Sequence, residues 1–483
     1  MQTLDVRGRP QPGAGGPGTE FRMPDVIGGR REVPLLDGRR VPQAFLDNAA
    51  STKPLGEVSD FMRAIERYYS NIHRGTGHDS VFCTQRSQEA RQIVTDFVGG
   101  DPERDVAVPV RNSTEGLNLL ATSFDFSPDD VVLTSLLEHH SNDLPWRGRA
   151  RVEHISLRED ATFDTDRLER RLEELGGKVR VVAISGASNV TGEVLPIHTI
   201  ASLAHRHGAR IVVDAAQLAP HRAIAMRSHD DPDHLDFVVF SAHKMNAPYG
   251  EGAIVGPRDH FCAAAPYLQG GGAVYAVGLD HVVWADTPER QEAGTPNILG
   301  LFALAAVIRT YQRIGWDRIV AHEKALTRRL LKGMAAIEGV SILGPQDADR
   351  LDDRLGVVTF AVGDLHHHHV AAILSYEHGV AVRAGCFCAH PLIKHLLRVT
   401  PESERDLEAN IALRDRRFIP GAVRVSIGLH NDIEEIDRFL FALGEIAAGR
   451  WMGEYVQDRE TGEFWPKGFR FDFTDCPAFP AAP

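Results

Sequence analysis

The chain has few cysteines, no excess of positive charge and no long hydrophobic run. Five cysteines among 483 residues are too few, and odd in number, for a disulfide framework, so a reducing cytoplasm is the expected compartment. A formal net charge of −13 argues against a protein that binds nucleic-acid phosphates. No apolar run reaches about 18 residues, and Met1–Gly18 contains no apolar stretch like that of a secretory signal. We therefore expect a cytoplasmic protein with neither a nucleic-acid partner nor a membrane span.

The length and the pattern along the chain predict two domains with an extension at each end. Residues 1–40, which include the Pro- and Gly-rich stretch Arg7–Gly18, are expected to be a disordered or extended arm. Residues 41–300 alternate short apolar runs with helical patterns, which predicts a large α/β domain on a mostly parallel sheet. Residues 301–449 predict a smaller α/β domain. Residues 450–483 predict an aromatic, polar tail that lies on the surface as an extended arm.

Short apolar runs predict strands, and amphipathic stretches predict helices. The strands expected in the large domain are Val131–Thr134, Val179–Ile184, Arg210–Val213 and Phe237–Phe240. The helices expected there are Leu117–Ser123 and Ile197–His207. The smaller domain is expected to contain a helix at Leu301–Ile314 and strands at Gly356–Phe360 and Ala422–Ile427.

Polar residues follow three of these strands. One strand leads into Asp214 and Gln217, the next into Ser241, His243 and Lys244, and an earlier one into Ser185–Asn189. In open parallel sheets ligands bind beyond the carboxyl ends of the strands, so these residues should converge on one crevice.

Their chemistry suits a pyridine cofactor. A buried Asp214 would keep a ring nitrogen protonated, and a partly buried Lys244 amine could condense with an aldehyde. Ser241 and His243 could hold a phosphate. Taken alone, a strand-terminal Asp is more often a cap and a lone Lys more often a surface residue. The two motifs together, each at the end of an apolar run, favour the cofactor site.

Two further segments could complete such a site. Ser113 and Thr114 open a predicted helix, whose free N–H groups and positive dipole end attract phosphate, although such a pair is also a common cap. His139 follows another strand and could stack on the ring.

Several motifs resemble the class V aminotransferase family, and within it the cysteine desulfurase and selenocysteine lyase group. The similarity spans roughly Phe45 to Leu440, and its segments are LDNAAS, SNIHRG, RNSTEGLNLL, EHHSNDLPW, ASNVTGEVLPI, VDAAQ, SAHK and EAGTPN. The resemblance implies a type I pyridoxal-phosphate fold, with a large domain on a mostly parallel seven-stranded sheet and a smaller C-terminal α/β domain.

The resemblance also implies a role for each matching residue. Lys244 would bind pyridoxal 5'-phosphate covalently, Asp214 would contact the pyridine nitrogen, Gln217 the ring hydroxyl, and His139 would stack on the ring. Thr114, Ser241 and His243 would bind the phosphate, and Asn189 would lie near substrate and ring. Family members are homodimers, so Gly294 and Thr295 would reach the phosphate of the neighbouring subunit.

The segment Arg383–Pro391 is the most informative for reaction type. Gly and Pro bracket it as a loop, and Arg383 is a plausible cation for stabilising a thiolate. It fits the R-x-G-x-x-C-A-x-P pattern of short-loop, Suf-type desulfurases, which implies Cys388 as the nucleophile. Two histidines usually precede that cysteine, whereas Cys386 and Phe387 stand here. Cys386 could resolve or receive a persulfide, or simply pack as a small apolar residue.

Arg424 lies within a predicted strand, where a charge needs a partner. A structural ion pair is one interpretation, and the resemblance implies that Arg424 grips the substrate α-carboxylate. The run His366–His369 lacks a matching ligand set, so no metal is expected. The stretch Asn71–His78 holds one residue more than the common H-R-G-x-H pattern, which leaves a role for His78 open.

The predicted function is a cysteine desulfurase that converts L-cysteine to L-alanine, with a persulfide on Cys388 for an acceptor protein. One alternative is a C–S or C–Se β-lyase, or another class V enzyme, without persulfide relay. The other is a non-enzymatic sulfur-relay protein with a vestigial pocket.

Overall fold

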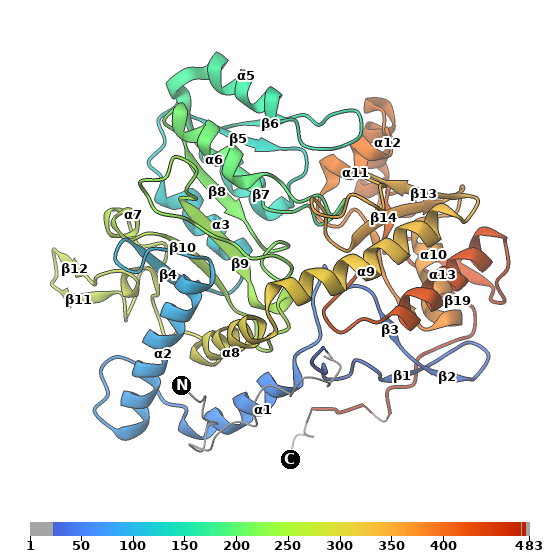
Figure 1. The fold of residues 1–483 in the computed structure, drawn as a ribbon, viewed down its shortest axis with the longest axis horizontal. Coiled ribbons are helices and arrows are strands. Elements are labelled where there is room, and N and C mark those ends of the chain that lie inside the picture. The colour runs from blue at the N-terminus through green and yellow to red at the C-terminus, as the bar shows by residue number, and fades with distance from the viewer. Residues whose placement is uncertain (1–22, 475, 480–483) are drawn as a thin grey trace.

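A seven-stranded sheet forms the centre of the larger domain in the computed structural model, which describes residues 23–474 and 476–479 (Figure 1). Its strand order is β4-β10-β9-β8-β7-β5-β6. Only β10 runs antiparallel to its neighbours, which confirms the predicted mostly parallel sheet. The strands are β4 (Asp105–Val110), β5 (Val131–Ser135), β6 (Arg151–Ile155), β7 (Val179–Ser185), β8 (Arg210–Asp214), β9 (Phe237–Ser241) and β10 (Gly252–Pro257).

Helices cover both faces of this sheet (Figure 1). In β8, Ile211 and Val213 face one hydrophobic core while Val212 faces the other. Burial on both faces explains the uninterrupted apolar runs of the central strands. The helices of this domain are α1 (Gly56–Ile65), α2 (His78–Phe97), α3 (Ser113–Ser123), α4 (Leu144–Arg147), α5 (Thr165–Leu175), α6 (Ile197–Arg206), α7 (Arg258–Ala263) and α8 (Ile298–Ile314). Helix α8 was expected in the smaller domain, but its apolar side chains are buried in the core of the large domain.

The smaller domain is built on a four-stranded antiparallel sheet of order β13-β14-β17-β16. The long helix α9 (Trp316–Ala335) leads into it from α8 (Figure 1). The remaining elements are β13 (Val340–Leu343), β14 (Val357–Val362), α10 (His367–His378), β15 (Val380–Ala381), β16 (Arg383–Gly385), α11 (His390–Leu396), α12 (Pro401–Ala412), β17 (Ala422–Ser426) and α13 (Ile433–Ala447).

Among the described residues, no single helix is long and apolar enough to span a bilayer. Helices α8 and α9 meet that test only when taken together, and they are bent by 81° at their junction.

The N-terminal segment from Glu32 onward folds with the smaller domain rather than forming an arm. Strands β1 (Glu32–Pro34) and β2 (Arg40–Pro42) form a hairpin, and β3 (Ala44–Phe45) pairs in parallel with β15. Ala44 and Leu46 are buried in the core of the smaller domain. Residues from 41 onward were expected in the large domain. Residues 44–46 belong instead to the smaller domain, because the partner strand of β3 is β15, which is remote in sequence. The Arg7–Gly18 stretch lies outside the described residues.

The C-terminal tail also differs from the extended arm that we expected. Strands β18 (Tyr455–Gln457) and β19 (Phe464–Pro466) form a hairpin that packs on α10. The buried Glu377 carboxylate accepts hydrogen bonds from the N–H groups of Met452 and Gly453 and from the Tyr455 hydroxyl, at 2.8–2.9 Å. The ring of His369 stacks on Phe464 with 4.8 Å between centroids.

A third hairpin, of β11 (Val274–Val277) and β12 (Val282–Trp284), projects from the edge of the large domain (Figure 1). It exposes Tyr275, Val277 and Leu279, so an apolar surface lies open on the single chain.

Candidate active site

A cavity of about 510 Å³ lies where β7, β8 and β9 end and the two domains meet. It is lined by twelve of the predicted site residues: Ser113, Thr114, His139, Asn189, Asp214, Gln217, Ser241, His243, Lys244, Arg383, Cys388 and Arg424. Arg383, Cys388 and Arg424 come from the smaller domain. The other nine residues come from the large domain. The site therefore exists only when both domains are folded against each other.

Lys244 and Asp214 lie at the ends of adjacent parallel strands. Asp214 is the last residue of β8, and Lys244 ends the short 3₁₀ turn Ala242–Lys244 after β9. Burial lowers the pKa of Lys244 to about 8, although the charge of Asp214 opposes the shift. Burial raises the pKa of Asp214, and the Ala216 N–H donates to its carboxylate at 3.0 Å. The cavity thus holds an amine that is easily freed of its proton, beside a buried acid.

The amide of Gln217 shows that the cavity suits a polar ring. Its Nε2 donates to the carbonyl of Ala49 at 2.7 Å, while its Oε1 is buried without a hydrogen-bond partner. Buried polar atoms are normally paired, so a bound molecule with a donor, such as a ring hydroxyl, would satisfy this oxygen.

Hydroxyl groups cluster at the N-terminus of α3. Ser241 Oγ accepts from the Ser113 N–H at 2.7 Å and donates to Ser113 Oγ at 2.9 Å. The Thr114 and Ser141 hydroxyls lie 2.7 Å apart. Hydroxyls around the positive end of a helix dipole are well placed to bind a phosphate.

His139 presents a neutral ring to the cavity. Its Nδ1 accepts from the Ser141 N–H at 3.1 Å, so the proton resides on Nε2. Burial, and then the charge of Lys244, lower the pKa of His139 to about 3. A neutral aromatic ring in this wall could stack on a cofactor.

Glu138, which had no predicted role, anchors the loop that carries His139. Its buried carboxylate accepts from the hydroxyls of Ser135 and Ser185 at 2.6 and 2.7 Å, and from the Asn142 amide at 2.7 Å. Burial raises the pKa of Glu138 to about 7. The carboxylate joins the ends of β5 and β7 to this loop.

Arg424 is almost fully buried in β17 and shares a carboxylate with Arg383 on β16. Asp47 Oδ1 lies 3.2 Å from Arg424 Nη2, and Asp47 Oδ2 lies 2.9 Å from Arg383 Nη2. Arg424 Nη1 also donates to the Asn189 carbonyl at 3.0 Å, and its buried Nε has no partner. The ion-pair interpretation of Arg424 therefore holds, while the unpaired Nε–H of this cavity-lining side chain could still donate to a ligand. Asp47 is a second residue to which no role was given, although it lies in the LDNAAS segment.

The Cys388 loop adopts an unusual backbone. Phe387 and Cys388 both have φ of +53°, a left-handed conformation that costs energy for residues other than glycine. Hydrogen bonds from the large domain hold both carbonyls: Asn189 Nδ2 donates to Phe387 O at 2.8 Å, and the His140 N–H donates to Cys388 O at 2.7 Å. The loop is thereby held with Cys388 exposed to the cavity.

The thiol of Cys386 points elsewhere. It donates to the carbonyl of Pro420 at 2.8 Å, and burial raises its pKa to about 11. Packing, the second of the two interpretations of Cys386, agrees with this geometry.

Residues 44–439 match the family model of class V aminotransferases. The chain belongs to this family. The match confirms the resemblance seen in the motifs. Enzymes of this class generally use pyridoxal phosphate and act on a small amino-acid substrate.

Relatives of this class V chain are named as cysteine desulfurases. A probable cysteine desulfurase of Halalkalibacterium halodurans is 35% identical over 76% of this chain and 89% of its own length. A cysteine desulfurase of Haloferax volcanii is 32% identical over 84% of this chain and 90% of its own. The apo structure of a cysteine desulfurase from Thermococcus onnurineus matches with a TM-score of 0.75 and 32% identity, covering 89% of this chain and 99% of that one. These matches confirm the predicted type I fold.

Three further segments of this class V protein lie outside the cavity. Gly294 and Thr295 do not line it, and Gly294 N donates to Gly271 O in the exposed region beside the β11–β12 hairpin. His78 is exposed at the start of α2, paired with Asp79. In the run His366–His369, Nε2 of His366 and of His367 each lie about 3 Å from a backbone carbonyl.

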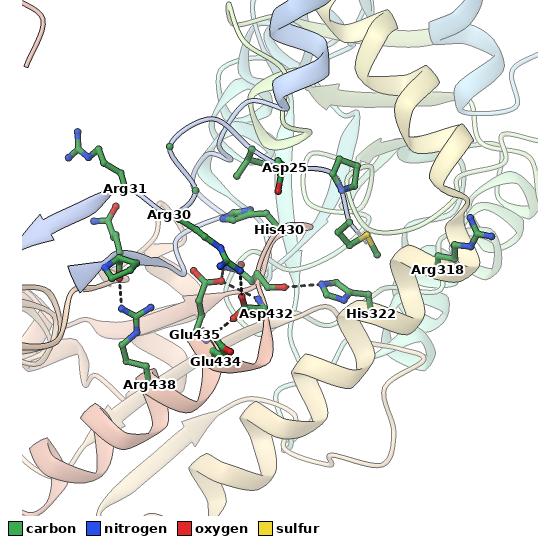
Figure 2. A pocket seen from close by; sticks show the side chains of 18 of the residues that line it. Asp25, Arg30, Arg31, Arg318, His322, His430, Asp432, Glu434, Glu435 and Arg438 are labelled. Atoms are coloured by element: carbon green, nitrogen blue, oxygen red, sulfur yellow. Dashed lines mark hydrogen bonds and ion pairs between the residues drawn. The ribbon is translucent and has the colours of Figure 1, made fainter. Parts of the chain in front are cut away.

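A larger cavity, of about 870 Å³, separates the N-terminal segment from α9 and the start of α13 (Figure 2). Several of its polar side chains have partners: Arg30 binds Asp432 at 3.1 Å, Arg438 donates to the Pro42 carbonyl, and His322 Nε2 faces the Asn431 carbonyl. Neither cysteine nor lysine lines it, so the smaller cavity is the candidate active site of this class V protein.

Proposed function

We propose that this chain is a pyridoxal-phosphate-dependent cysteine desulfurase that forms L-alanine from L-cysteine and leaves a persulfide on Cys388. The observation that carries the proposal is that Lys244 and Cys388 line one cavity from opposite domains. The names of the relatives support it.

The residues present fit pyridoxal phosphate. Lys244 would hold its aldehyde carbon, and Asp214 and Gln217 would bind the ring nitrogen and hydroxyl. His139 would cover the ring. The phosphate would be bound by the hydroxyls of Ser113, Thr114 and Ser241, together with His243. When bound, the cofactor supplies an electron sink for negative charge at the substrate Cα.

The side chains of this protein then have separate tasks. Arg424, positioned by Asp47, would bind the substrate α-carboxylate, with Arg383 at its side. The Lys244 amine, once neutral, can accept the Cα proton and return it. The Cys388 thiolate attacks the substrate sulfur, so that an S–S bond forms while the Cβ–S bond breaks. The electron pair of the broken bond stays with carbon, which takes up a proton to give alanine.

The persulfide must leave before the next turnover, because the reaction consumes a free thiolate. An exposed Cys388 on a loop is suited to delivery to an acceptor protein or a reductant, and the cytoplasm suits such a thiol. The protein is proposed to act as a homodimer. The exposed apolar hairpin β11–β12 and the position of Gly294 and Thr295 outside their own cavity support that arrangement.

The test is a Cys388→Ser variant, with Cys386→Ser as the matched control. We expect Cys388→Ser to keep the visible absorbance of bound cofactor but to lose alanine formation from L-cysteine. The control should keep both. Full alanine production by Cys388→Ser would refute the desulfurase proposal.

A β-eliminating lyase is the second candidate, because Cys386 and Phe387 replace the two histidines of the short-loop pattern. Its products from L-cysteine would be pyruvate and ammonia instead of alanine. Product analysis of the wild-type protein therefore separates the two candidates. A relay protein without catalysis would bind no cofactor, so absence of cofactor absorbance would favour it.

A further inference from the structure

Two histidines and an aspartate meet at the opposite end of the strands that carry the active site. His205 is in the last turn of α6, and His234 and Asp236 belong to the segment that enters β9. One ligand atom of each residue lies within 4.8 Å of the others. Asp236 is buried, whereas the two histidines are half-buried. In the active site, Asp214 ends β8 at its other end and Lys244 follows the other end of β9.

The ring orientations of the two histidines are fixed by the backbone. His205 Nδ1 lies 2.8 Å from the Pro232 carbonyl, and His234 Nδ1 lies 2.7 Å from the Asp231 carbonyl. A carbonyl can only accept, so Nδ1 carries the hydrogen in both rings. Each neutral ring therefore directs the lone pair of Nε2 towards Asp236, at 2.8 Å for His205 and 3.6 Å for His234.

An Nε2 lone pair and a carboxylate oxygen repel each other, so a proton or a metal ion must lie between each histidine and Asp236. If protons supplied it, two imidazolium rings would be stacked with 4.3 Å between centroids. Arg210 Nη1, at 2.8 Å from Asp236, would add a third cation to the same carboxylate. A single metal ion would replace both protons, and an imidazole that donates its other N–H to a backbone carbonyl is the usual form of a metal-bound histidine.

We propose that His205, His234 and Asp236 form a structural site for a divalent transition metal of the Zn²⁺ type. Two imidazoles and one carboxylate suit Zn²⁺, whereas Mg²⁺ prefers oxygen ligands alone. Arg210 and the Ile211 N–H, at 2.8 and 2.9 Å, hold the carboxylate from outside the ligand set. The neighbouring His229 is not a ligand, because its Nε2 binds Asp105 at 2.8 Å.

The expected effect of the metal is on stability. The site joins the end of α6 to the first residues of β8 and β9, so an ion bound there favours the folded state. It is remote from the cavity of the proposed desulfurase, and it does not depend on that activity.

The experiment uses full-length protein without a polyhistidine tag, loaded with pyridoxal phosphate and stripped of metal. Zn²⁺ is added, excess is removed by gel filtration, and bound zinc is measured per chain. The test variants are His205→Gln and His234→Gln, each alone, and the matched control is His207→Gln, one residue beyond α6. Zinc bound elsewhere, at His366–His369 or Cys388, contributes equally to all four proteins.

We expect the wild-type and control proteins to retain one zinc per chain more than either test variant. Their melting temperature should rise with Zn²⁺ and not with Mg²⁺, while the test variants show no such rise. Cofactor absorbance in the test variants establishes that they are folded. Equal zinc content and an equal thermal response in all four proteins would overturn the proposal.

Discussion

His140 holds Cys388 in place from the opposite domain. Its N–H donates to the Cys388 carbonyl at 2.7 Å, and its Nε2 accepts from the N–H of His390 at 3.2 Å. Two bonds from one residue thus bracket a cysteine whose backbone is left-handed. Because burial and the neighbouring His390 lower the pKa of His140, the ring stays neutral and can keep accepting.

Replacing His140 with Leu should therefore slow the reaction of Cys388 without displacing the cofactor. Loss of one hydrogen bond of about 0.5–1.5 kcal/mol predicts a decrease in kcat of roughly 2- to 10-fold. His140→Gln offers an acceptor again and should recover part of the loss. Alanine formation and cofactor absorbance are the two measurements. An unchanged kcat in His140→Leu would show that the loop needs no such support.

Asp47→Asn tests the carboxylate shared by the two arginines. Arg424 is 3% exposed, so removing its counter-charge leaves a buried cation uncompensated. We expect the free energy of unfolding to fall by about 3 kcal/mol and KM for cysteine to rise. Urea unfolding and steady-state kinetics measure the two effects. The exposed pair of Asp37 and Arg39 provides the control, since Asp37→Asn should change neither quantity.

The two thiols of the loop should differ in reactivity. Burial raises the pKa of Cys386 to about 11, and its thiol is engaged by the Pro420 carbonyl, whereas Cys388 is exposed. Near neutral pH, iodoacetamide should alkylate Cys388 and spare Cys386, as read by peptide mass spectrometry. Incubation with L-cysteine should place the extra sulfur on Cys388 alone. A persulfide found on Cys386 would instead assign it a relay role.

Local sequence signals were sufficient for the centre of the large domain. The run that ends at Asp214 was predicted because both faces of the middle of β8 are buried, which makes Ile211–Val213 apolar. The polar residues after such strands converge because parallel strands end at the same edge. The predicted strands ended at Val213 and Phe240, one residue before β8 and β9 end at Asp214 and Ser241. A polar last residue breaks the apolar run, although its backbone still belongs to the strand.

Contacts between remote segments could not be predicted in this way. The pairing of β3 with β15 joins Ala44 to Val380, and neither sequence contains a periodic pattern. Asp47 acquires its role only when β16 and β17 bring Arg383 and Arg424 side by side. Glu138 likewise becomes an anchor through Ser185 on another strand. Each of these side chains looks like an ordinary polar residue until the fold supplies its partner.

The docked tail offers a stability test that is independent of catalysis. Glu377 is buried and accepts hydrogen bonds from two N–H groups and one hydroxyl of residues 452–455. Glu377→Ala should leave these three donors without a partner. We expect the hairpin to become a site of limited proteolysis after residue 450, with cofactor absorbance retained. Glu454→Ala, which removes only an exposed pair with Lys467, should resist protease as the wild type does. Equal resistance of Glu377→Ala would mean that the aromatic contacts alone dock the tail.

The pH dependence of cofactor binding should report the charge of Lys244. Only a neutral amine condenses with an aldehyde, and burial lowers the pKa of Lys244 to about 8 from an ordinary 10.5. Reconstitution of apoenzyme with pyridoxal phosphate should therefore accelerate as pH rises through about 8. Because the Asp214 charge raises that pKa, Asp214→Asn should move the midpoint to lower pH, whereas the exposed Asp352→Asn should not. A midpoint near 10.5, or an upward shift in Asp214→Asn, would contradict the coupling of these two groups.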